Sequence, residues 1–279
     1  MDRVIIGYGN RIEQATLSGG NWQAALNNIK IRALQERARS VNALRVSTWF
    51  DVDLGQERLV NMLAINAHTL SVNGLVRITA GSTPGGSDLY DSGWADAWPP
   101  AFATSQLEWE DINFWDGRLT AEQRAAYTSC YALELPIVYA RYWRFELDDV
   151  NNTDGYIEIG RVFMGRKFAP IFEIGAELGW QDESKVSRSL MGVKYFDKIK
   201  LFRVANLSIP AMSDEQAMSG LFELQRIAGK TEEVLFIGAP DTPSEMTRQA
   251  FVGTLRKLSP IRAFSYKLNS SGLEIEEDL

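Results

Sequence analysis

Alternating apolar and polar positions predict that most of the first 165 residues form short β-strands. One side of the segment 43–54 carries Leu44, Val46, Thr48, Phe50, Val52 and Leu54, and the other side carries Arg45, Ser47, Asp51 and Asp53. This period of two is typical of a half-buried strand, and Gly55 then supplies a turn. The segments 59–65 and 74–80 have the composition of two further strands. Short strands separated by turns indicate an antiparallel sandwich.

The segments 135–147 and 156–164 have the clearest strand patterns in the sequence. In the first of them every second residue near its end is apolar: Trp143, Phe145 and Leu147. The intervening residues 148–155 are rich in Asp, Asn and Gly, which favour turns. Two apolar runs around such a cluster predict a β-hairpin. Upstream, Thr120 is a suitable N-cap for a short helix within 120–131.

A change in composition after Arg166 predicts a second domain over residues 166–279. The segment 193–209 interleaves basic and apolar residues and predicts one or two strands. The segment 214–228 predicts an amphipathic helix, because Ser213 is a good N-cap and Gly229 is a good terminating residue. Further strand patterns follow at 232–237, 250–258, 261–268 and 273–279. The predicted fold class is therefore mainly β: an antiparallel sandwich over 1–165, followed by a smaller α+β domain over 166–279.

The stretch 81–116 is rich in Gly, Pro and Trp. Half of the eight tryptophans of the chain lie in it, namely Trp94, Trp98, Trp109 and Trp115. Rigid aromatic side chains on a long loop either anchor the loop to its own sheet or offer a surface for a partner or a glycan. The first interpretation is favoured, because tryptophan is highly buried on average.

Composition narrows the classes of function. The 279 residues have a formal net charge of −7, which argues against nucleic acid as the main partner. The single cysteine, Cys130, excludes an internal disulfide framework and a cysteine zinc cluster, and the single histidine, His68, excludes histidine-rich metal sites. We expect neither a signal peptide nor membrane insertion, since no apolar stretch approaches the roughly 18 residues of a spanning helix.

No motif predicts a catalytic residue. A Ser-His-Asp triad would have to use His68, but the sequence contains no Gly-x-Ser-x-Gly nucleophile motif. A structural role is therefore favoured for His68. Asp51 and Asp53 point to the same face of one strand, but a glycosidase needs two carboxyl groups across one cleft, which the sequence does not show. The same holds for the acidic residues of the aromatic stretch: Glu108, Glu110 and Asp111.

Cofactor and metal sites are not predicted either. The turn with Asp149, Asn151 and Asp154 offers oxygen ligands that a calcium ion accepts, but it departs from the EF-hand pattern, and Asn and Asp are ordinary turn residues. The segment 81–86 lacks the Lys-Ser/Thr of a phosphate-binding loop. We therefore expect no catalytic, cofactor or metal residue.

Three segments of the first domain resemble discoidin-like, galactose-binding-type jelly rolls. These are 47–55, then 62–78, and finally 140–147 together with 156–164. The resemblance covers roughly residues 10–165 and implies a jelly-roll sandwich. Members of that family often bind sugars or surfaces through loops at one end of the sandwich, so that the tryptophan-rich stretch is the equivalent region here.

The arrangement of the whole chain resembles minor tail proteins of long-tailed phages, of the distal-tail or tail-tip type. The cues are 157–165, then 233–241, Gly253-Thr-Leu and Leu258-Ser-Pro-Ile261. This resemblance implies a tail-tube-like fold for residues 166–279 and a ring, most often a hexamer, in which the long strands of 193–209 and 250–268 complete a shared barrel.

The leading expectation is therefore a structural, non-enzymatic virion protein of a phage tail tip, assembled in the host cytoplasm. Its expected partners are further copies of itself, the tail tube, the tape-measure protein and the baseplate hub. The alternative is a carbohydrate-binding receptor module that recognises a host surface glycan through Trp94, Trp98, Trp109 or Trp115. A third interpretation is a glycan hydrolase.

Overall fold

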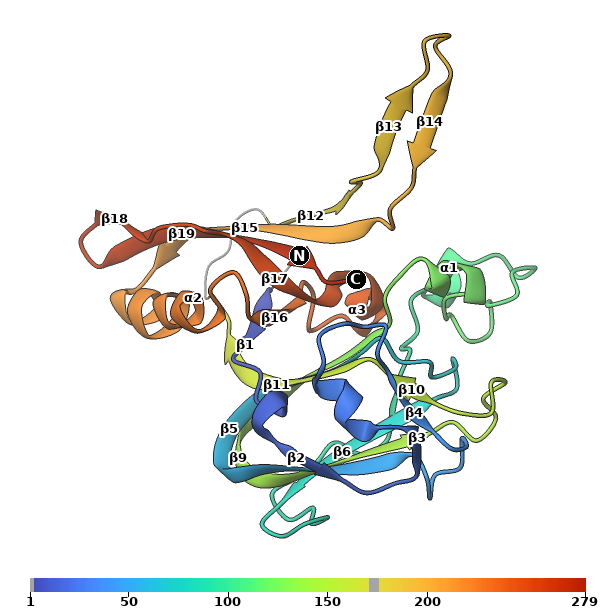
Figure 1. Cartoon of the computed structure of the whole chain (residues 1–279). Coiled ribbons are helices and arrows are strands. Elements are labelled where there is room, and N and C mark those ends of the chain that lie inside the picture. The colour runs from blue at the N-terminus through green and yellow to red at the C-terminus, as the bar shows by residue number, and fades with distance from the viewer. Residues whose placement is uncertain (1–2, 171–175) are drawn as a thin grey trace. The chain divides into compact units, whose positions relative to one another are not determined.

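The computed structural model describes residues 3–170 and 176–279 (Figure 1). Contacts divide the chain into two compact units: Met1–Ala169 with Val234–Val252, and Pro170–Glu233 with Gly253–Leu279. The sequence predicted one division at 165/166, and the difference is the segment 234–252. That segment belongs with the first unit because β16 (Glu233–Ile237) pairs antiparallel with β1 (Ile5–Tyr8).

The first unit is built from antiparallel strands, as the sequence predicted. Its main sheet has the order β16-β1-β11-β5-β9-β6-β7. The remaining bounds are β11 (Arg161–Phe168), β5 (Trp49–Asn66), β9 (Cys130–Asp148), β6 (Leu75–Gly81), β7 (Tyr90–Asp91), β8 (Ala95–Asp96) and β2 (Thr16–Ser18). A second sheet contains β10 (Glu158–Ile159), β4 (Ala38–Ser40) and β3 (Trp22–Ala24).

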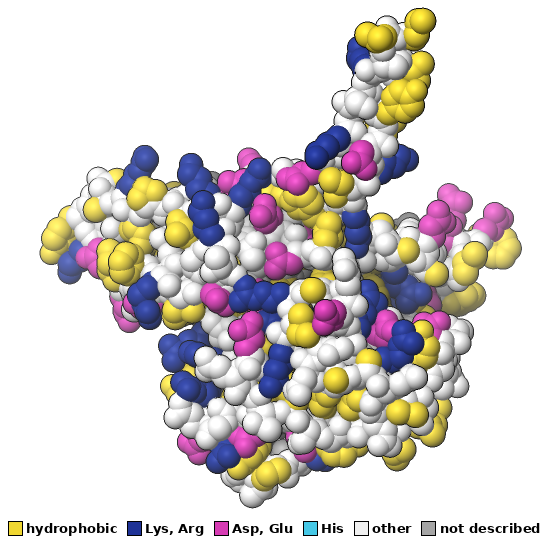
Figure 2. Space-filling view, viewed as in Figure 1, with side chains coloured by type: hydrophobic (Ala, Val, Ile, Leu, Met, Phe, Trp, Pro, Cys, Tyr) yellow, Lys and Arg dark blue, Asp and Glu magenta, His cyan; other side chains and the backbone are white. Residues whose placement is uncertain are grey.

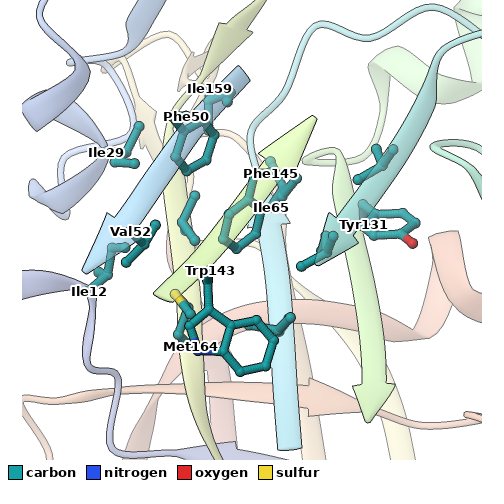
Figure 3. Close-up of a cluster of buried hydrophobic side chains, with 14 of the residues drawn as sticks. Ile12, Ile29, Phe50, Val52, Ile65, Tyr131, Trp143, Phe145, Ile159 and Met164 are labelled. Atoms are coloured by element: carbon teal, nitrogen blue, oxygen red, sulfur yellow. The ribbon is translucent and has the colours of Figure 1, made fainter. Parts of the chain in front are cut away.

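The core of the first unit lies between these two sheets (Figure 3). Ile159 of β10 belongs to the same buried cluster as Phe50 of β5 and Phe145 of β9. The two phenylalanine rings stack with their centroids 4.8 Å apart. Because side chains of both sheets meet in one apolar layer, this unit is a β-sandwich.

The strand β5 is buried on both faces along its second half. Leu63 and Ile65 point into the core between the two sheets, whereas Met62 and Ala64 belong to a second cluster with residues of β1 and β16. A strand buried on both faces has a continuous apolar run in place of an alternating one. This accounts for the apolar run at 59–65. Residues 49–54 and 59–65, predicted as parts of two strands, lie in the single strand β5.

Two details of this region differ from the sequence prediction. Residues 43–48 form turns, and Leu44 and Val46 are exposed. Gly55 does not end a strand but lies within β5, with φ +75°, where the register with β9 shifts. A glycine tolerates this backbone conformation, so the strand continues past an irregularity.

The predicted hairpin of 135–147 and 156–164 is wrong. The strands β9 and β11 both pair with β5, one on each side, and not with each other. Residues 158–159 form β10, which pairs with β4 in the second sheet. The turn-rich segment 148–155 is thus a connection between sheets.

The second unit combines strands with one longer helix. Its sheet has the order β12-β15-β19-β17, with β18 beside β19. The bounds are β12 (Ala176–Gln181), β15 (Phe202–Met212), β19 (Leu268–Glu277), β17 (Ala250–Leu258) and β18 (Arg262–Ser265). Residues 250–252 of β17 belong to the first unit. A two-stranded sheet, β13 (Lys185–Arg188) with β14 (Lys194–Asp197), completes the unit.

The predicted helix 214–228 is confirmed, with π-type hydrogen bonding over Gln216–Phe222 followed by α2 (Glu223–Ala228). The Oγ of Ser213 accepts a hydrogen bond from the Gln216 amide at 3.2 Å, and Gly229 follows with φ +53°. The helix α1 (Ala121–Ala125) has the predicted cap at Thr120 but is shorter than expected, since Cys130 already lies in β9. The other helices are α3 (Pro243–Gln249) and 3₁₀ turns at Ile12–Gln14, Leu26–Lys30 and Thr104–Gln106.

The helices in the described part of the chain are all too short or too polar to cross a lipid bilayer.

Candidate functional site

Trp98, one of the four tryptophans singled out above, is a buried anchor. Its indole Nε1 donates a hydrogen bond to the carbonyl oxygen of Leu70 at 2.8 Å. The ring packs edge-on against His68, with centroids 5.4 Å apart, and the Arg124 guanidinium lies 5.3 Å from its centroid. A buried ring with its polar atom satisfied fixes the loop to the sandwich and leaves no face for a ligand.

Trp94 is half-buried. The guanidinium carbon of Arg45 lies 4.2 Å from the centroid of the Trp94 ring, which is a cation–π contact. Arg45 also forms an ion pair with Asp148 at 2.5 Å. This face of the ring is therefore occupied by the protein itself.

Trp109 and Trp115 have the opposite environment. They are 77% and 91% exposed, and Ile112 between them is 97% exposed. These three residues are called the aromatic patch below. Apolar side chains of this size gathered in the open mark an interaction surface. The structure thus separates the four tryptophans into two that contact other parts of the first unit and two that are largely exposed.

Consecutive turns hold the aromatic patch in place. The amide of Asp111 donates to the carbonyl of Glu108 at 2.9 Å, and the amide of Phe114 donates to the carbonyl of Asp111 at 3.0 Å. The carbonyl of Gly117 accepts from the amides of Ala101 and Phe102, both at 2.8 Å, and so closes the loop. The patch is therefore part of an ordered loop with defined hydrogen bonds.

Acidic residues surround the aromatic patch. Exposed carboxylates lie on either side of its members: Glu108, Glu110, Asp111 and Asp116. Asp111 accepts a hydrogen bond from the amide of Glu108, and Asp116 accepts one from the amide of Arg118. The stretch 108–116 contains no lysine or arginine. The patch therefore combines apolar area with a negative field.

A second exposed surface lies in the second unit. The strands β13 and β14 and the turn between them, residues 185–197, extend away from the rest of this unit (Figure 1). We call this segment the hairpin arm. Val186 pairs with Phe196 and Ser187 with Tyr195 across the two strands. The turn is closed by the amide of Ser189, which donates to the carbonyl of Val193 at 2.9 Å, and Gly192 has φ +82°.

The hairpin arm exposes apolar side chains on both faces and at its end. Leu190 and Met191 at the turn are almost fully exposed, and the other exposed apolar residues are Val186, Val193, Tyr195 and Phe196. Basic residues alternate with them along the arm and in the residues that follow it, before β15: Lys185, Arg188, Lys194, Lys198 and Lys200. Figure 2 shows hydrophobic and basic side chains together on this projection.

The arm was not predicted as a separate element. The sequence predicted one or two strands over 193–209, and the structure has two there, β14 and β15. The signal that distinguishes them is burial: β14 is exposed at every position, and β15 is mostly buried. The alternation of apolar and polar residues does not distinguish a strand that packs on a core from a strand that is exposed on both faces.

A polar cleft of about 550 Å³ lies over the second sheet of the first unit, lined by Gln23, Ala24, Gln35, Arg37, Arg39 and Glu158. The carboxylate of Glu158 accepts from Arg39 at 2.7 Å and from Arg37 at 3.3 Å. The Arg39 guanidinium also stacks on Tyr156 at 4.4 Å. Two cations thus share one carboxylate, which leaves positive charge at the cleft. The sequence analysis did not identify it, because its residues come from three separate segments.

Three of the titratable groups considered for catalysis, His68, Asp51 and Asp53, are held in structural contacts. His68 is buried, and its pKa is lowered to about 3 by desolvation and by the nearby Arg124 and Arg37. The carboxylate of Asp51 forms two hydrogen bonds with Arg144, at 2.7 and 2.8 Å. Asp53 does the same with Arg141 at 2.6 and 2.8 Å, which lowers the pKa of Asp53.

The remaining candidates for chemistry lie apart. Cys130 is buried at the start of β9. The carboxylate of Asp149 accepts hydrogen bonds from the amide and hydroxyl of Ser71 and from Asn152. Among the described residues, no three His, Cys, Asp or Glu side chains are grouped so that they could hold a metal ion. The carboxylate of Asp149 thus ties the turn 148–155 to the segment around Ser71.

No protein-family model matches the chain, and no curated protein gives a significant match. Among solved structures, the CBM32-1 module of a family 31 glycoside hydrolase from Clostridium perfringens has 10% identity and a TM-score of 0.34, with 57% of this chain and 99% of that chain covered. A fucose-binding module from Streptococcus pneumoniae has 12% identity, a TM-score of 0.34 and coverages of 57% and 96%.

The family 32 module of C. perfringens NanJ, solved with galactose, has 13% identity, a TM-score of 0.35 and coverages of 58% and 99%. At this level of similarity the alignments define neither a ligand nor an activity for this chain. Its antiparallel, mainly β architecture rests on its own strand pairing.

Proposed function

We propose that this protein is a non-catalytic structural component of a phage tail tip, of the distal-tail type, that assembles as a ring between the tail tube and the baseplate hub. In this proposal the sandwich unit is the discoidin-like jelly roll and the second unit is the tube-like ring former, with a hexamer as the expected stoichiometry. The observation that carries the proposal is the hairpin arm.

The hairpin arm has the properties of a segment that needs a partner. An isolated two-stranded hairpin is marginally stable in water, because its side chains have too little to pack against. Here both strands of the arm are exposed at every position. Exposed apolar side chains concentrated in one element are typical of an interface. Burial against another protein stabilises such an arm.

The edge of the second unit supports the same proposal. The strand β12 is the last in the strand order and pairs with β15 on one side. Trp180 on this strand is about half exposed. An edge strand offers unpaired backbone groups that a neighbouring chain can bind. Contacts between two different surfaces of identical chains close into a ring when the rotation between copies permits it.

The engagement of the candidate catalytic groups supports a structural role. Asp51 and Asp53 each neutralise an arginine on β9. The imidazole of His68 packs against Trp98 inside the first unit. The side chains of Asp51, Asp53 and His68 thus make contacts within the first unit, which is consistent with the proposed structural role.

The proposed partners follow from the resemblance to distal-tail proteins. They are further copies of this chain, the tail tube, the tape-measure protein and the hub, in the virion after assembly in the host cytoplasm. The net charge of −7 supports a place around a DNA channel, because an acidic ring does not retain phosphates.

The test is the mass of the purified full chain, measured by sedimentation velocity and followed by negative-stain electron microscopy. The proposal predicts a closed ring of several copies, and a variant in which Lys185–Asp197 is replaced by a short Gly-Ser turn should lose the ring and keep its fold by circular dichroism. Single chains at all concentrations would contradict self-assembly.

Carbohydrate binding is the second candidate, and the polar cleft is the observation that favours it. Arginine and glutamine side chains give bidentate and paired hydrogen bonds to hydroxyl and carboxylate groups. The excess positive charge beside Glu158 suits a glycan that contains a carboxylate. A glycan array tests this: binding to a defined glycan, lost in Arg39→Ala but kept in Arg45→Ala, would establish it, and an array without signal would exclude the glycans it contains.

A further inference from the structure

We propose that the hairpin arm of one copy docks on the aromatic patch of a second copy. The inference rests on the proposed function, because it names the surface that receives the arm within the assembly. It requires that two surfaces of the same chain, one in each unit, are complementary in charge and in apolar character.

The charges of the two surfaces are opposite. Residues 185–200 contain five basic residues and one acidic residue, Asp197. The stretch 108–116 around the aromatic patch contains four acidic residues and no basic one. Complementary potentials steer two surfaces together and disfavour contacts between like surfaces, so arm-to-arm and patch-to-patch contacts are both disfavoured.

The apolar side chains suit each other as well. The arm offers Leu190 and Met191 at its end, and the patch offers the open rings of Trp109 and Trp115. A methionine is unbranched and polarizable, and its sulfur makes favourable contacts with aromatic rings. Tryptophan, tyrosine and methionine are enriched in the buried central part of protein interfaces.

Hydrogen bonds within the chain restrain both surfaces before they meet. The arm is fixed by its cross-strand pairs and, at its base, by Ser184, whose Oγ accepts a hydrogen bond from the Ile199 amide at 2.9 Å. The loop of the patch is closed at Gly117, whose φ is +63° and where a Cβ would lie 2.5 Å from the carbonyl oxygen of Phe102. Ordered surfaces lose little conformational entropy on association, which favours affinity.

The pairing of two different surfaces is compatible with assembly into a ring. Each copy has one arm and one patch, so each copy can give its arm to one neighbour and receive the arm of another. When the two neighbours are different copies, the contacts are heterologous and generate a ring or a filament, whereas a reciprocal exchange of arms between two copies would give a two-fold dimer. The proposed contact therefore accounts for a ring without a second type of interface.

Cysteine crosslinking between two variants tests the contact. One preparation carries Met191→Cys and the other Ile112→Cys, and the native Cys130 is buried. After mixing and mild oxidation, mass spectrometry of linked peptides should find the 191–112 disulfide, which is necessarily between chains. The control pairs Met191→Cys with Val46→Cys, another exposed site in the first unit, and should give at least tenfold less linked peptide.

Charge reversal provides an independent test, in which the strength of association is measured. The residues changed are exposed, and their side chains do not hold the backbone in place. The variant Arg188→Glu with Lys194→Glu, and the variant Glu108→Lys with Glu110→Lys, should each weaken association by about tenfold or more. Combined in one chain, the four changes should restore it to within about threefold. The control, Glu36→Lys with Glu57→Lys, should leave association unchanged.

The outcomes separate this inference from the proposed function. A ring that forms normally but shows no 191–112 link and no response to charge reversal would overturn the arm-to-patch contact and leave the assembly role intact. Failure of the wild-type chain to associate at all would overturn both. A 191–112 disulfide formed within single chains that carry both cysteines would show that the arm binds its own molecule, which also overturns the proposal.

Discussion

The guanidinium of Arg203 and the carboxylate of Glu277 form a buried, bidentate ion pair in the second unit. The Nε and Nη2 atoms of Arg203 donate to the two carboxylate oxygens at 2.9 and 2.6 Å, and its backbone amide donates to Oε2 at 2.9 Å. The two side chains are 2% and 3% exposed. Removing one member of such a pair leaves the other charge buried without this counter-charge.

Glu277→Ala is therefore expected to lower the free energy of unfolding by about 3–5 kcal/mol. Urea unfolding followed by circular dichroism measures this change. The matched control is Glu223→Ala, which removes the exposed pair with Arg226 on α2 and should have little effect. Equal effects of the two substitutions would show that the Arg203 pair is not buried as described.

His68 gives a pH dependence that can be assigned to one residue, because it is the only histidine in the sequence. Burial lowers the pKa of its imidazole from 6.5 to about 3. Between these two values the unfolded chain binds a proton that the folded chain does not, so stability falls as the pH decreases, by up to about 1.4 kcal/mol per pH unit.

The free energy of unfolding should accordingly decrease between pH 6.5 and about 5, where few carboxylates titrate. In His68→Leu this slope should flatten. An unchanged slope in the variant would mean that His68 is protonated in the folded protein, which contradicts its burial against Trp98.

The two kinds of tryptophan should respond differently to truncation. Trp98→Ala removes a buried anchor and is expected to cost about 3–5 kcal/mol of stability, whereas Trp109→Ala should change stability by less than about 0.5 kcal/mol. Thermal unfolding distinguishes them. A large loss in Trp109→Ala would place that ring in the core and remove it from the aromatic patch.

Two glycines on strands of the second unit form another matched pair. A Cβ at Gly253 on β17 would lie 1.9 Å from the carbonyl oxygen of Glu276, whereas a Cβ at Gly179 on β12 meets nothing within 4 Å. Gly253→Ala should destabilise the protein by about 1–3 kcal/mol, and Gly179→Ala should be neutral or slightly stabilising. Similar values for both would contradict the close approach of β17 and β19.

Local signals in the sequence predicted several elements well. Ser213 and Gly229 mark the ends of the helix in the second unit, and Thr120 caps α1. The alternation around Trp143 identified β9. These elements were predictable because caps and a period of two depend on residues close in sequence. Pro243, the first residue of α3, is a further local signal for the start of a helix.

Pairing between distant segments was not predictable in the same way. The turn at 148–155 suggested a hairpin, but β5 separates β9 from β11 because its apolar residues are buried on both faces. The return of β16 to pair with β1 joins segments more than 200 residues apart, which no local pattern encodes. For the candidate site, the sequence identified the tryptophan-rich stretch but could not tell the buried Trp98 from the exposed Trp109.

The most direct test of the central claim is the mass of the assembly formed by the full chain in solution, compared with that of a Leu190→Ser, Met191→Ser variant. Both residues are exposed at the end of the hairpin arm, so the substitutions leave the fold unchanged. The account predicts a multi-copy ring for the wild-type chain and single chains for the variant. A wild-type protein of single-chain mass, or an unchanged ring in the variant, would contradict it.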